Sequence, residues 1–451
     1  MPGFGQFGER DARGCDRAPA WPRAVTIASA GVLLLFAPSH RARAQVPPPT
    51  SPARAGQLTL NEVLQRSLRF NPEIAKLDAT LADKLGRASE AEVKLNPTFK
   101  VTAGRTSERG AVGTELELEA EQPLRPSDFG LRKTYATALR AAANLEQQAD
   151  VLRVLNATAN VYYRAWALQE HGALLTRARG QADDALGTIQ QQLEAGQSNI
   201  SQRSIFEAEV ARFSAELLAV RGEQAAAQAE LERAIGARSA GLQLLQPTFP
   251  PLPSTAAMAA FAESRSGLRR IALAQRAAAA QGLRVARADA VFPEFAPGLI
   301  TRYGSRNDEA NFGITIAGRI PIWDRNQGAV TRERGALAAA ERELASFDRI
   351  SLDRSIGARR QQLLNLEARA AAFGDRVIPA YRAAYDATLS QFRAGQASTL
   401  QLFEVQKSLV DAEEKSFEYA VEALSARTHL EQLIGGRIEE VRTTVSTRSN
   451  K

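Results

Sequence analysis

With 451 residues, the chain is long enough to bury a large core in two or three ordinary domains. Ala, Leu, Arg, Glu and Gln are abundant and aromatic residues make up only 6%, which favours long helices over a sandwich or mixed fold. The single cysteine, Cys15, excludes a disulfide framework. The formal net charge is +7, but no basic cluster with interleaved aromatic residues supports nucleic-acid binding.

Residues 1–44 have the pattern of a secretory signal peptide. Arginines precede an apolar run that ends at Pro38, and Ala42-Arg43-Ala44 provides a small-x-small cleavage pattern. The alternative, a membrane-anchoring helix, is disfavoured because the apolar run is too short. We therefore expect a mature chain that begins at Gln45. Beyond the signal no apolar stretch reaches 18 residues, so an exported protein of this sequence is either soluble or a barrel.

The sequence repeats itself. The segment 192–197, QLEAGQ, returns as QFRAGQ at 391–396, and the pair Ile235-Gly236 returns as Ile434-Gly435, both at a spacing of 199 residues. We therefore expect two copies of one unit. The expected domains are a Pro-rich linker over 45–56, a first repeat over 57–236, a mid-height connector over 237–264, a second repeat over 265–436 and a polar C-terminal tail over 437–451.

Each repeat is expected to begin with a helix that leads into two strands. In the first repeat the helix covers 71–95 and ends at Asn96-Pro97, because the residue before proline disfavours the helical region. A strand over 98–106 follows. In the next strand the residues alternate between apolar and acidic: Leu116, Leu118 and Ala120 against Glu115, Glu117, Glu119 and Glu121.

The second repeat shows the same strand signals. A strand is expected over 294–304, and Phe312, Ile314 and Ile316 alternate with smaller or polar residues in the strand that follows. The polar segments 107–113 and 305–310 would close the strands into two hairpins.

A very long helix follows each strand pair. From about Gly130 to Leu193 the first contains heptad-spaced Val154, Val161, Leu168 and Leu175, which is typical of a coiled-coil seam. Roughly 60 helical residues make a rod of about 90 Å. A return helix over 200–236 and the helix over 71–95 together match that length, so they are expected to stack end to end beside it.

The two long helices share an irregularity near the same height. Gly180 and Pro379 lie 199 residues apart, and both residue types weaken a helix. The sequence therefore predicts a bend at this level in both repeats, although independent helix faults would look the same.

Strands with one apolar face in an exported protein suggest a membrane barrel, because open edges do not survive in lipid. Four strands cannot close a barrel alone, since the smallest barrels have about eight, so the chain is expected to associate with further copies; three copies would give twelve strands. Glu115, Glu117 and Glu119 would then face the lumen and favour cations. The alternative is a soluble antiparallel bundle, in which the glutamates form a solvated strand face.

Candidate catalytic and metal-binding residues are scarce. After the signal only His171 and His429 remain as histidines, far apart in sequence, so we expect no soft-metal site. No catalytic triad, phosphate-binding loop or dinucleotide fingerprint is found. We expect no enzymatic activity and no cofactor.

Several motifs resemble those of the TolC family of outer-membrane efflux proteins, and in particular its CzcC-like, heavy-metal branch. They are the opening over 58–64 with Asn71-Pro72-Glu73-Ile74, Leu95-Asn96-Pro97 before the first strand, the run Arg319 to Gly328 after the last strand, and both Ala-Gly-Gln turns. The resemblance covers about residues 57–436. The Pro-x-x-Asp-Arg-Asn-x-Gly run is its most specific part.

The resemblance implies a mainly α-helical fold with a small β part. Duplicated coiled-coil hairpins would form a periplasmic α-barrel, and four strands per chain would join a homotrimeric, twelve-stranded β-barrel in contact with outer-membrane lipid. It implies as partners a periplasmic adaptor (a membrane fusion protein) and an inner-membrane RND-type transporter, with heavy-metal cations as substrate. The adaptor would contact the hairpin tips: Ala195, Gly196, Gln197, Ala394, Gly395 and Gln396.

Some members of this family close the channel with paired aspartates beyond the second tip. The matching positions here are Gln401 and Glu404, which makes them the candidate aperture gate. Two other functions share these features: a type I protein secretion channel, and a soluble periplasmic coiled-coil scaffold or adaptor.

Overall fold

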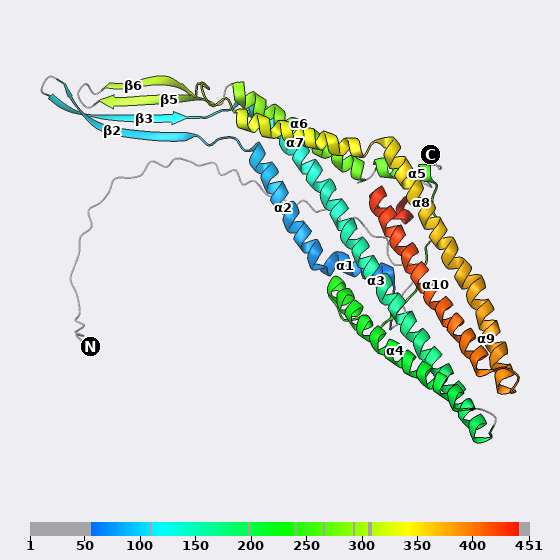
Figure 1. Ribbon diagram of the computed structural model, residues 1–451. Coiled ribbons are helices and arrows are strands. Elements are labelled where there is room, and N and C mark those ends of the chain that lie inside the picture. The colour runs from blue at the N-terminus through cyan, green and yellow to red at the C-terminus, as the bar shows by residue number, and fades with distance from the viewer. Residues whose placement is uncertain are drawn as a thin grey trace, which may run out of the picture. The chain divides into compact units, whose positions relative to one another are not determined.

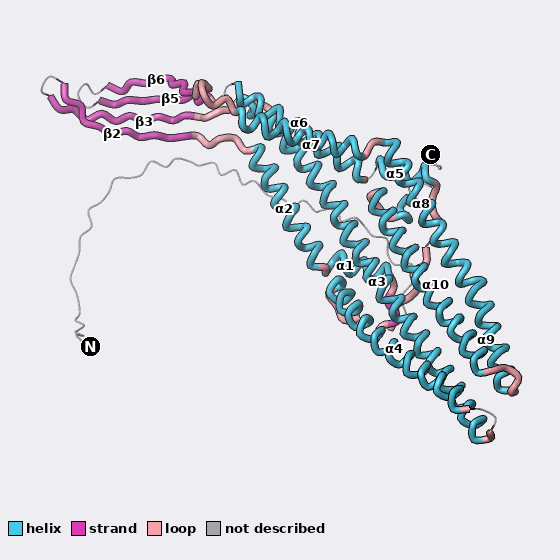
Figure 2. Tube along the Cα trace, in the orientation of Figure 1, coloured by secondary structure: helices cyan, strands magenta, loops and turns pink. Residues whose placement is uncertain are grey.

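The computed structural model describes residues 56–441 except 109–110, 197–198, 240, 250, 265–266, 292–293 and 305–308. The expected signal peptide, nearly all of the linker, Gln197 of the first tip and the tail beyond 441 lie outside the described residues. Long helices predominate, and four strands extend from one end of them (Figures 1 and 2). None of the helices described is both long and apolar enough to cross a lipid bilayer.

Two short helices open the first repeat. α1 (Leu60–Phe70) begins with a capping box, in which Glu62 N–H donates to Thr59 Oγ1 at 3.3 Å and Thr59 N–H donates to the Glu62 carboxylate at 3.1 Å. α2 (Pro72–Glu92) follows at once, with Asn71 as its N-cap and proline in its first turn. α2 matches the helix expected over 71–95 but ends three residues earlier.

The strands of both repeats form one antiparallel sheet in the order β2-β3-β5-β6. Its members are β2 (Thr98–Glu108), β3 (Ala111–Glu121), β5 (Phe295–Gly304) and β6 (Glu309–Gly318). All four expected strands are present. Pairing of β3 with β5 joins the two hairpins, so each repeat supplies half of the sheet.

The hairpin of the first repeat is built from α3 (Leu131–Glu194) and α4 (Ile200–Ile235). α3 is unbroken over 64 residues, as its sequence predicts. Buried residues near the tip recur at spacings of three and four, which continues the expected seam: Leu175, Ala178, Ala182, Ala185 and Ile189. Phe206 and Phe213 of α4 belong to the same apolar cluster.

The second repeat has the same element order, with α6 (Leu268–Val291) in the place of α2. The helix in the place of α1 is α5 (Thr255–Ser264), which lies inside the stretch expected as the connector over 237–264. The long helix of this repeat is divided, in contrast to the continuous rod expected. α7 (Gln327–Ser346) ends before Asp348, whose carboxylate accepts from Ser351 N–H at 3.0 Å and so caps a new helix. That helix is α8 (Arg349–Ala372).

A π-helical turn, Phe373–Val377, separates α8 from α9 (Ile378–Arg393). Within it Ile378 N–H donates to Phe373 O, five residues earlier. Pro379 is the next residue and has no N–H to donate to the backbone of the preceding helical turn. The missing donor accounts for the irregular hydrogen bonding at this turn. α10 (Thr399–Ile434) then returns along the hairpin.

The long helices of the two repeats pack together, with α3 touching α2, α4, α6 and α10, and α10 also touching α8 and α9 (Figure 1). At mid-height the short strands β1 (Gln57–Leu58) and β4 (Gln243–Leu244) pair in parallel. The buried hydroxyl of Tyr162 lies 2.6 Å from Leu245 O, tying this connector to α3.

The start of the expected polar tail belongs to the core. Ile438 and Val441 are fully buried in an apolar cluster with Met258, Leu430 and Ile434. Two apolar side chains three residues apart on a helical turn give the segment 437–441 one buried face, which explains the difference from the expectation.

Candidate functional site: the sheet, its junction and the hairpin tips

The sheet has one apolar face and one polar face. The register pairs Leu118 with Val101 and Thr301, so the even residues of β3 share a face with the odd residues of β2 and β5. Most of its large apolar side chains are exposed, and Phe312, Ile314 and Ile316 on β6 are at least 80% exposed. A contiguous apolar patch of this kind marks a surface that meets lipid or another protein.

The polar face holds the glutamates that the sequence singled out. Glu115, Glu117 and Glu119 lie on it, half-buried, together with Glu121. Two of them have basic partners: Arg302 Nε lies 2.7 Å from Glu117, and Lys100 Nζ lies 3.6 Å from Glu119. The row is therefore less acidic in effect than the sequence alone indicates, because neighbouring strands offset part of its charge.

The Pro-x-x-Asp-Arg-Asn-x-Gly run that follows β6 anchors the start of α7. Asn326 adopts a left-handed conformation, with φ of 57°, and Asp324 accepts from its N–H at 2.9 Å. The Asn326 side chain donates to Ala286 O on α6 at 2.9 Å. These contacts explain why an asparagine occupies this position, since asparagine tolerates the left-handed region better than most residues.

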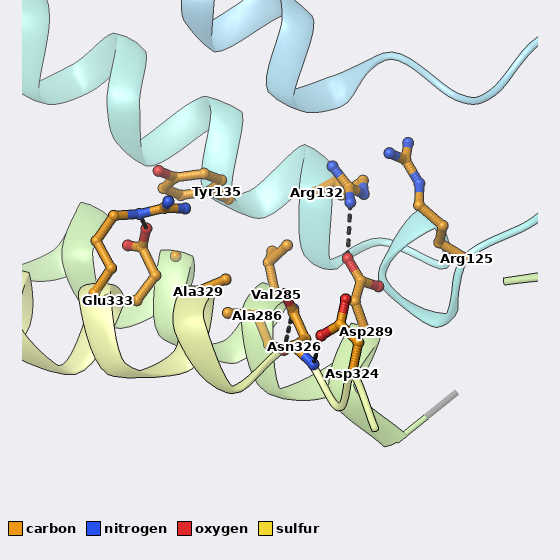
Figure 3. Close-up of a pocket in the computed structure, with 12 residues that line it drawn as sticks. Arg125, Arg132, Tyr135, Val285, Ala286, Asp289, Asp324, Asn326, Ala329 and Glu333 are labelled. Atoms are coloured by element: carbon orange, nitrogen blue, oxygen red, sulfur yellow. Dashed lines mark hydrogen bonds and ion pairs between the residues drawn. The ribbon is translucent and has the colours of Figure 1, made fainter. Parts of the chain in front are cut away.

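A charged network joins the repeats where the strands give way to the helices. Asp128, at the end of a 3-10 turn (Pro126–Asp128), accepts hydrogen bonds from Arg125 and pairs with Arg132 at 3.2 Å. Arg132 also reaches Asp289 of the second repeat at 2.7 Å. A cavity of about 410 Å³ lies beside this network (Figure 3). The cavity itself was not predicted from the sequence. The four-residue spacing of Asp128 and Arg132 is that of a helical ion pair, which is a local signal for the network beside it.

The two tips are tight turns with the same backbone conformation. Gly196 and Gly395 have φ values of 73° and 72°, a region that favours glycine. Ala195, Ala394 and Gln396 beside them are exposed. The structure thus places the expected tip residues, apart from Gln197, on exposed turns at the ends of the two hairpins.

The candidate gate residues lie just beyond the second tip. The carboxamide of Gln401 accepts from Ser398 N–H at 2.9 Å and completes a capping box at the start of α10. Glu404 is exposed one turn later. Gln401 therefore caps a helix in addition to its candidate role, and a gate at these two residues stays a prediction.

The two residues at the expected bend differ in their surroundings. Gly180 is exposed within the unbroken helix α3, and nothing lies within 4 Å of the position a Cβ would take. Pro379 follows the π-helical turn described above. The irregular helical hydrogen bonding thus lies in the second repeat.

Polar contacts that the sequence did not reveal join α3 to α10. Asn156 Nδ2 donates to Thr428 O at 3.0 Å, and Gln406 Nε2 donates to Ala178 O at 3.0 Å. The buried carboxylate of Glu413 binds Arg177 of α3 and Arg382 of α9. These contacts bridge residues far apart in sequence, so no local pattern could have shown them.

His171 of α3 and Glu414 of α10 belong to the same set of contacts. His171 Nε2 lies 3.0 Å from a Glu414 oxygen. This hydrogen bond raises the pKa of His171 above its usual value; the charges of Glu414, Glu216 and Glu223 add to the effect and partial burial opposes it.

Comparison with known proteins gives no matching family model. A segment of 144 residues is 30% identical to the cobalt-zinc-cadmium resistance protein CzcC of Cupriavidus metallidurans, covering 31% of this chain and 34% of that protein. The chain is 24% identical to the pyoverdine export outer membrane protein OpmQ of Pseudomonas aeruginosa, over 84% of this chain and 86% of that protein.

The fold matches that of the outer membrane protein VceC from Vibrio cholerae, with a TM-score of 0.68 at 18% identity, over 84% of this chain and 96% of VceC. The chain therefore has the fold of the TolC-type outer-membrane channels, with long helices and a few strands per chain. The expected family likeness, the mainly α-helical fold with a small β part and the outer-membrane location are confirmed, and the relatives are outer-membrane proteins, not enzymes. The α-barrel, the twelve-stranded β-barrel and the trimer stay predictions.

The His171–Glu414 pair gives a stability prediction. Because the pKa of folded His171 is raised, its stabilisation is fully present below the ordinary pKa of about 6.5 and is lost as the pH rises through the raised value. His171→Gln should lower the thermal midpoint more at about pH 5.5 than at about pH 8.5. Thermal denaturation in detergent measures this, with the exposed His429→Gln as control. A deficit of equal size at both pH values would contradict it.

Proposed function

We propose that the chain is the outer-membrane channel subunit of a tripartite efflux pump, and that three copies form a passive conduit. The observation that carries this proposal is the four-stranded sheet, which has an exposed apolar face and a charged opposite face. In the described part of the chain, no other strand pairs with the outer edges of β2 and β6. In lipid both edges need partners, and closure into a barrel with neighbouring copies supplies them.

The helical hairpins would extend the conduit into the periplasm and present their tips to an adaptor linked to an inner-membrane RND-type transporter. Support comes from the tips themselves, which carry small residues and an exposed apolar side chain each. Ile200 is 73% exposed and Leu400 is 53% exposed. Energy for transport would come from the inner-membrane partner.

The proposed substrate class is heavy-metal cations. The supporting observation is the segment similar to CzcC, a cobalt-zinc-cadmium resistance protein. The likeness to OpmQ, a pyoverdine export protein, extends over more of the chain, and neither name refers to protein secretion. Both comparisons favour efflux over a type I secretion channel.

A pair of substitutions on β6 tests the membrane assignment. Ile314→Lys places a charge on the apolar face, which should destabilise the barrel by about 2–4 kcal/mol per chain and reduce recovery in outer membranes. Asn311→Lys on the polar face of the same strand should be tolerated. Fractionation and heat-dependent migration on gels measure both. If Asn311→Lys and Ile314→Lys behave alike, or if the wild-type chain stays soluble and monomeric, the channel assignment fails.

The polar face gives a conduction prediction. Replacement of Glu115, Glu117 and Glu119 by Gln should lower the preference for cations, whereas Arg302→Gln should raise it, because Arg302 offsets Glu117. Reversal potentials in planar bilayers under a salt gradient measure the ratio of cation to anion permeability. A ratio that moves in neither direction would show that this face does not line the conduit.

The tips give a third prediction. Leu400→Glu should weaken binding of the pump's purified adaptor by about tenfold, because it puts a charge on the exposed apolar part of the second tip. The first turn of a helix tolerates a carboxylate, so folding should be unchanged. Lys415→Glu, exposed on the same helix away from the tip, is the control. Equal affinity for both variants would exclude Leu400 from the contact.

A further inference from the structure

The cavity at the junction of strands and helices has a strongly charged lining. α3, α6 and α7 form its walls, and the turn before α3 and the motif before α7 complete it (Figure 3). Its charged side chains have both signs: Arg125, Arg132 and Arg332 against Asp289, Asp324 and Glu333. A ligand that carries a positive and a negative group would match such a lining.

Two of these arginines are held in place but keep unused donors. Arg125 donates through Nε to Asp128 and through Nη2 to Asp128 and to Val93 O. Arg132 donates through Nε to Ser127 Oγ and through Nη2 to Asp289. Among the described residues, no bond is made by the Nη1 group of either one. Their guanidinium groups are thus fixed by carboxylates and still have N–H groups for an acceptor such as a phosphate.

Exposed apolar side chains lie next to the cavity lining in sequence. Phe129 follows the Arg125–Asp128 turn and is 71% exposed, and it stacks on Phe295 at the base of the sheet with ring centroids 6.4 Å apart. Trp323 precedes the lining residue Asp324 and is 86% exposed, beside Ile322 at 55%. Tryptophan is favoured at the level of lipid headgroups, where an apolar ring meets polar groups.

We propose that this cavity binds the headgroup of a phosphoethanolamine phospholipid in the leaflet that faces the helices. This rests on the proposed function, which places the strands in the membrane and the helices in the periplasm. The phosphate accepts hydrogen bonds from Arg125, Arg132 and Arg332, and the ammonium group meets Asp324 and Glu333. The acyl chains lie along Phe129, Trp323 and Ile322. The site would fix the height of the channel in the membrane.

Native mass spectrometry of the detergent-purified channel tests this site. The probes are dihexanoyl phosphatidylethanolamine, dihexanoyl phosphatidylglycerol and inorganic phosphate. The wild type should bind the ethanolamine lipid at up to one copy per chain, about fivefold better than the glycerol lipid. Arg332→Gln removes one cation, and Ala329→Trp fills the cavity without altering its charge. Both should lower occupancy about fivefold.

Arg334→Gln, an exposed arginine of α7 outside the cavity, is the matched control and should bind as the wild type does. Equal occupancy in all variants, equal binding of the two lipids, or displacement of the lipid by inorganic phosphate would each overturn the site. Each variant is first checked for outer-membrane fractionation. A soluble wild-type chain would contradict the proposed function, whereas a membrane channel without the headgroup preference contradicts this site alone.

Discussion

The structure depends on one constraint: the backbone groups at the edges of the sheet need hydrogen-bond partners. Among the residues that the structure describes, the order β2-β3-β5-β6 leaves one edge of β2 and one edge of β6 without a strand neighbour. An exposed apolar face such as that of β6 belongs in lipid, where no water satisfies an open edge. Closure by further copies of the same chain would satisfy both demands, which is why the proposed conduit is an oligomer.

The duplication supplies two similar halves, but their long helices differ in continuity. α3 is one uninterrupted helix, whereas the equivalent stretch of the second repeat is interrupted before Asp348 and again at the π-helical turn before Pro379. Polar contacts such as Asn156 with Thr428 and His171 with Glu414 join the rigid helix to α10. At the junction, the ion pair of Arg132 and Asp289 joins α3 of the first repeat to α6 of the second.

Local patterns in the sequence predicted the elements well and their long-range contacts poorly. Alternation around Leu116 and Glu117 predicted a two-faced strand, and the heptad ending at Leu175 predicted the seam of α3. The same patterns predicted a continuous long helix in the second repeat, which is wrong. Asp348 caps a new helix there, but one capping residue changes the apolar periodicity little. The patterns also predicted a polar tail, although Ile438 and Val441 are buried.

In the candidate site, too, the sequence indicated the residues but not their long-range contacts. The glutamate row was visible in the sequence, but its partners Lys100 and Arg302 follow only from the register of three strands. Gln401 was considered for its place beyond the tip, whereas its capping bond with Ser398 depends on the local fold. Pairings across the repeats, such as Arg132 with Asp289, have no signal in a single sequence.

The central claim, that copies of the chain close the sheet through β2 and β6, has a direct measurement. Cys15 is the only natural cysteine, so cysteines placed in pairs on the two edges, for example Thr102→Cys with Asn311→Cys and neighbouring registers, report on strand contact between chains. If three copies close the sheet, non-reducing gels of oxidised outer membranes will show disulfide-linked species that end at three chains. Monomers at every pairing, or a ladder that continues beyond three chains, would contradict it.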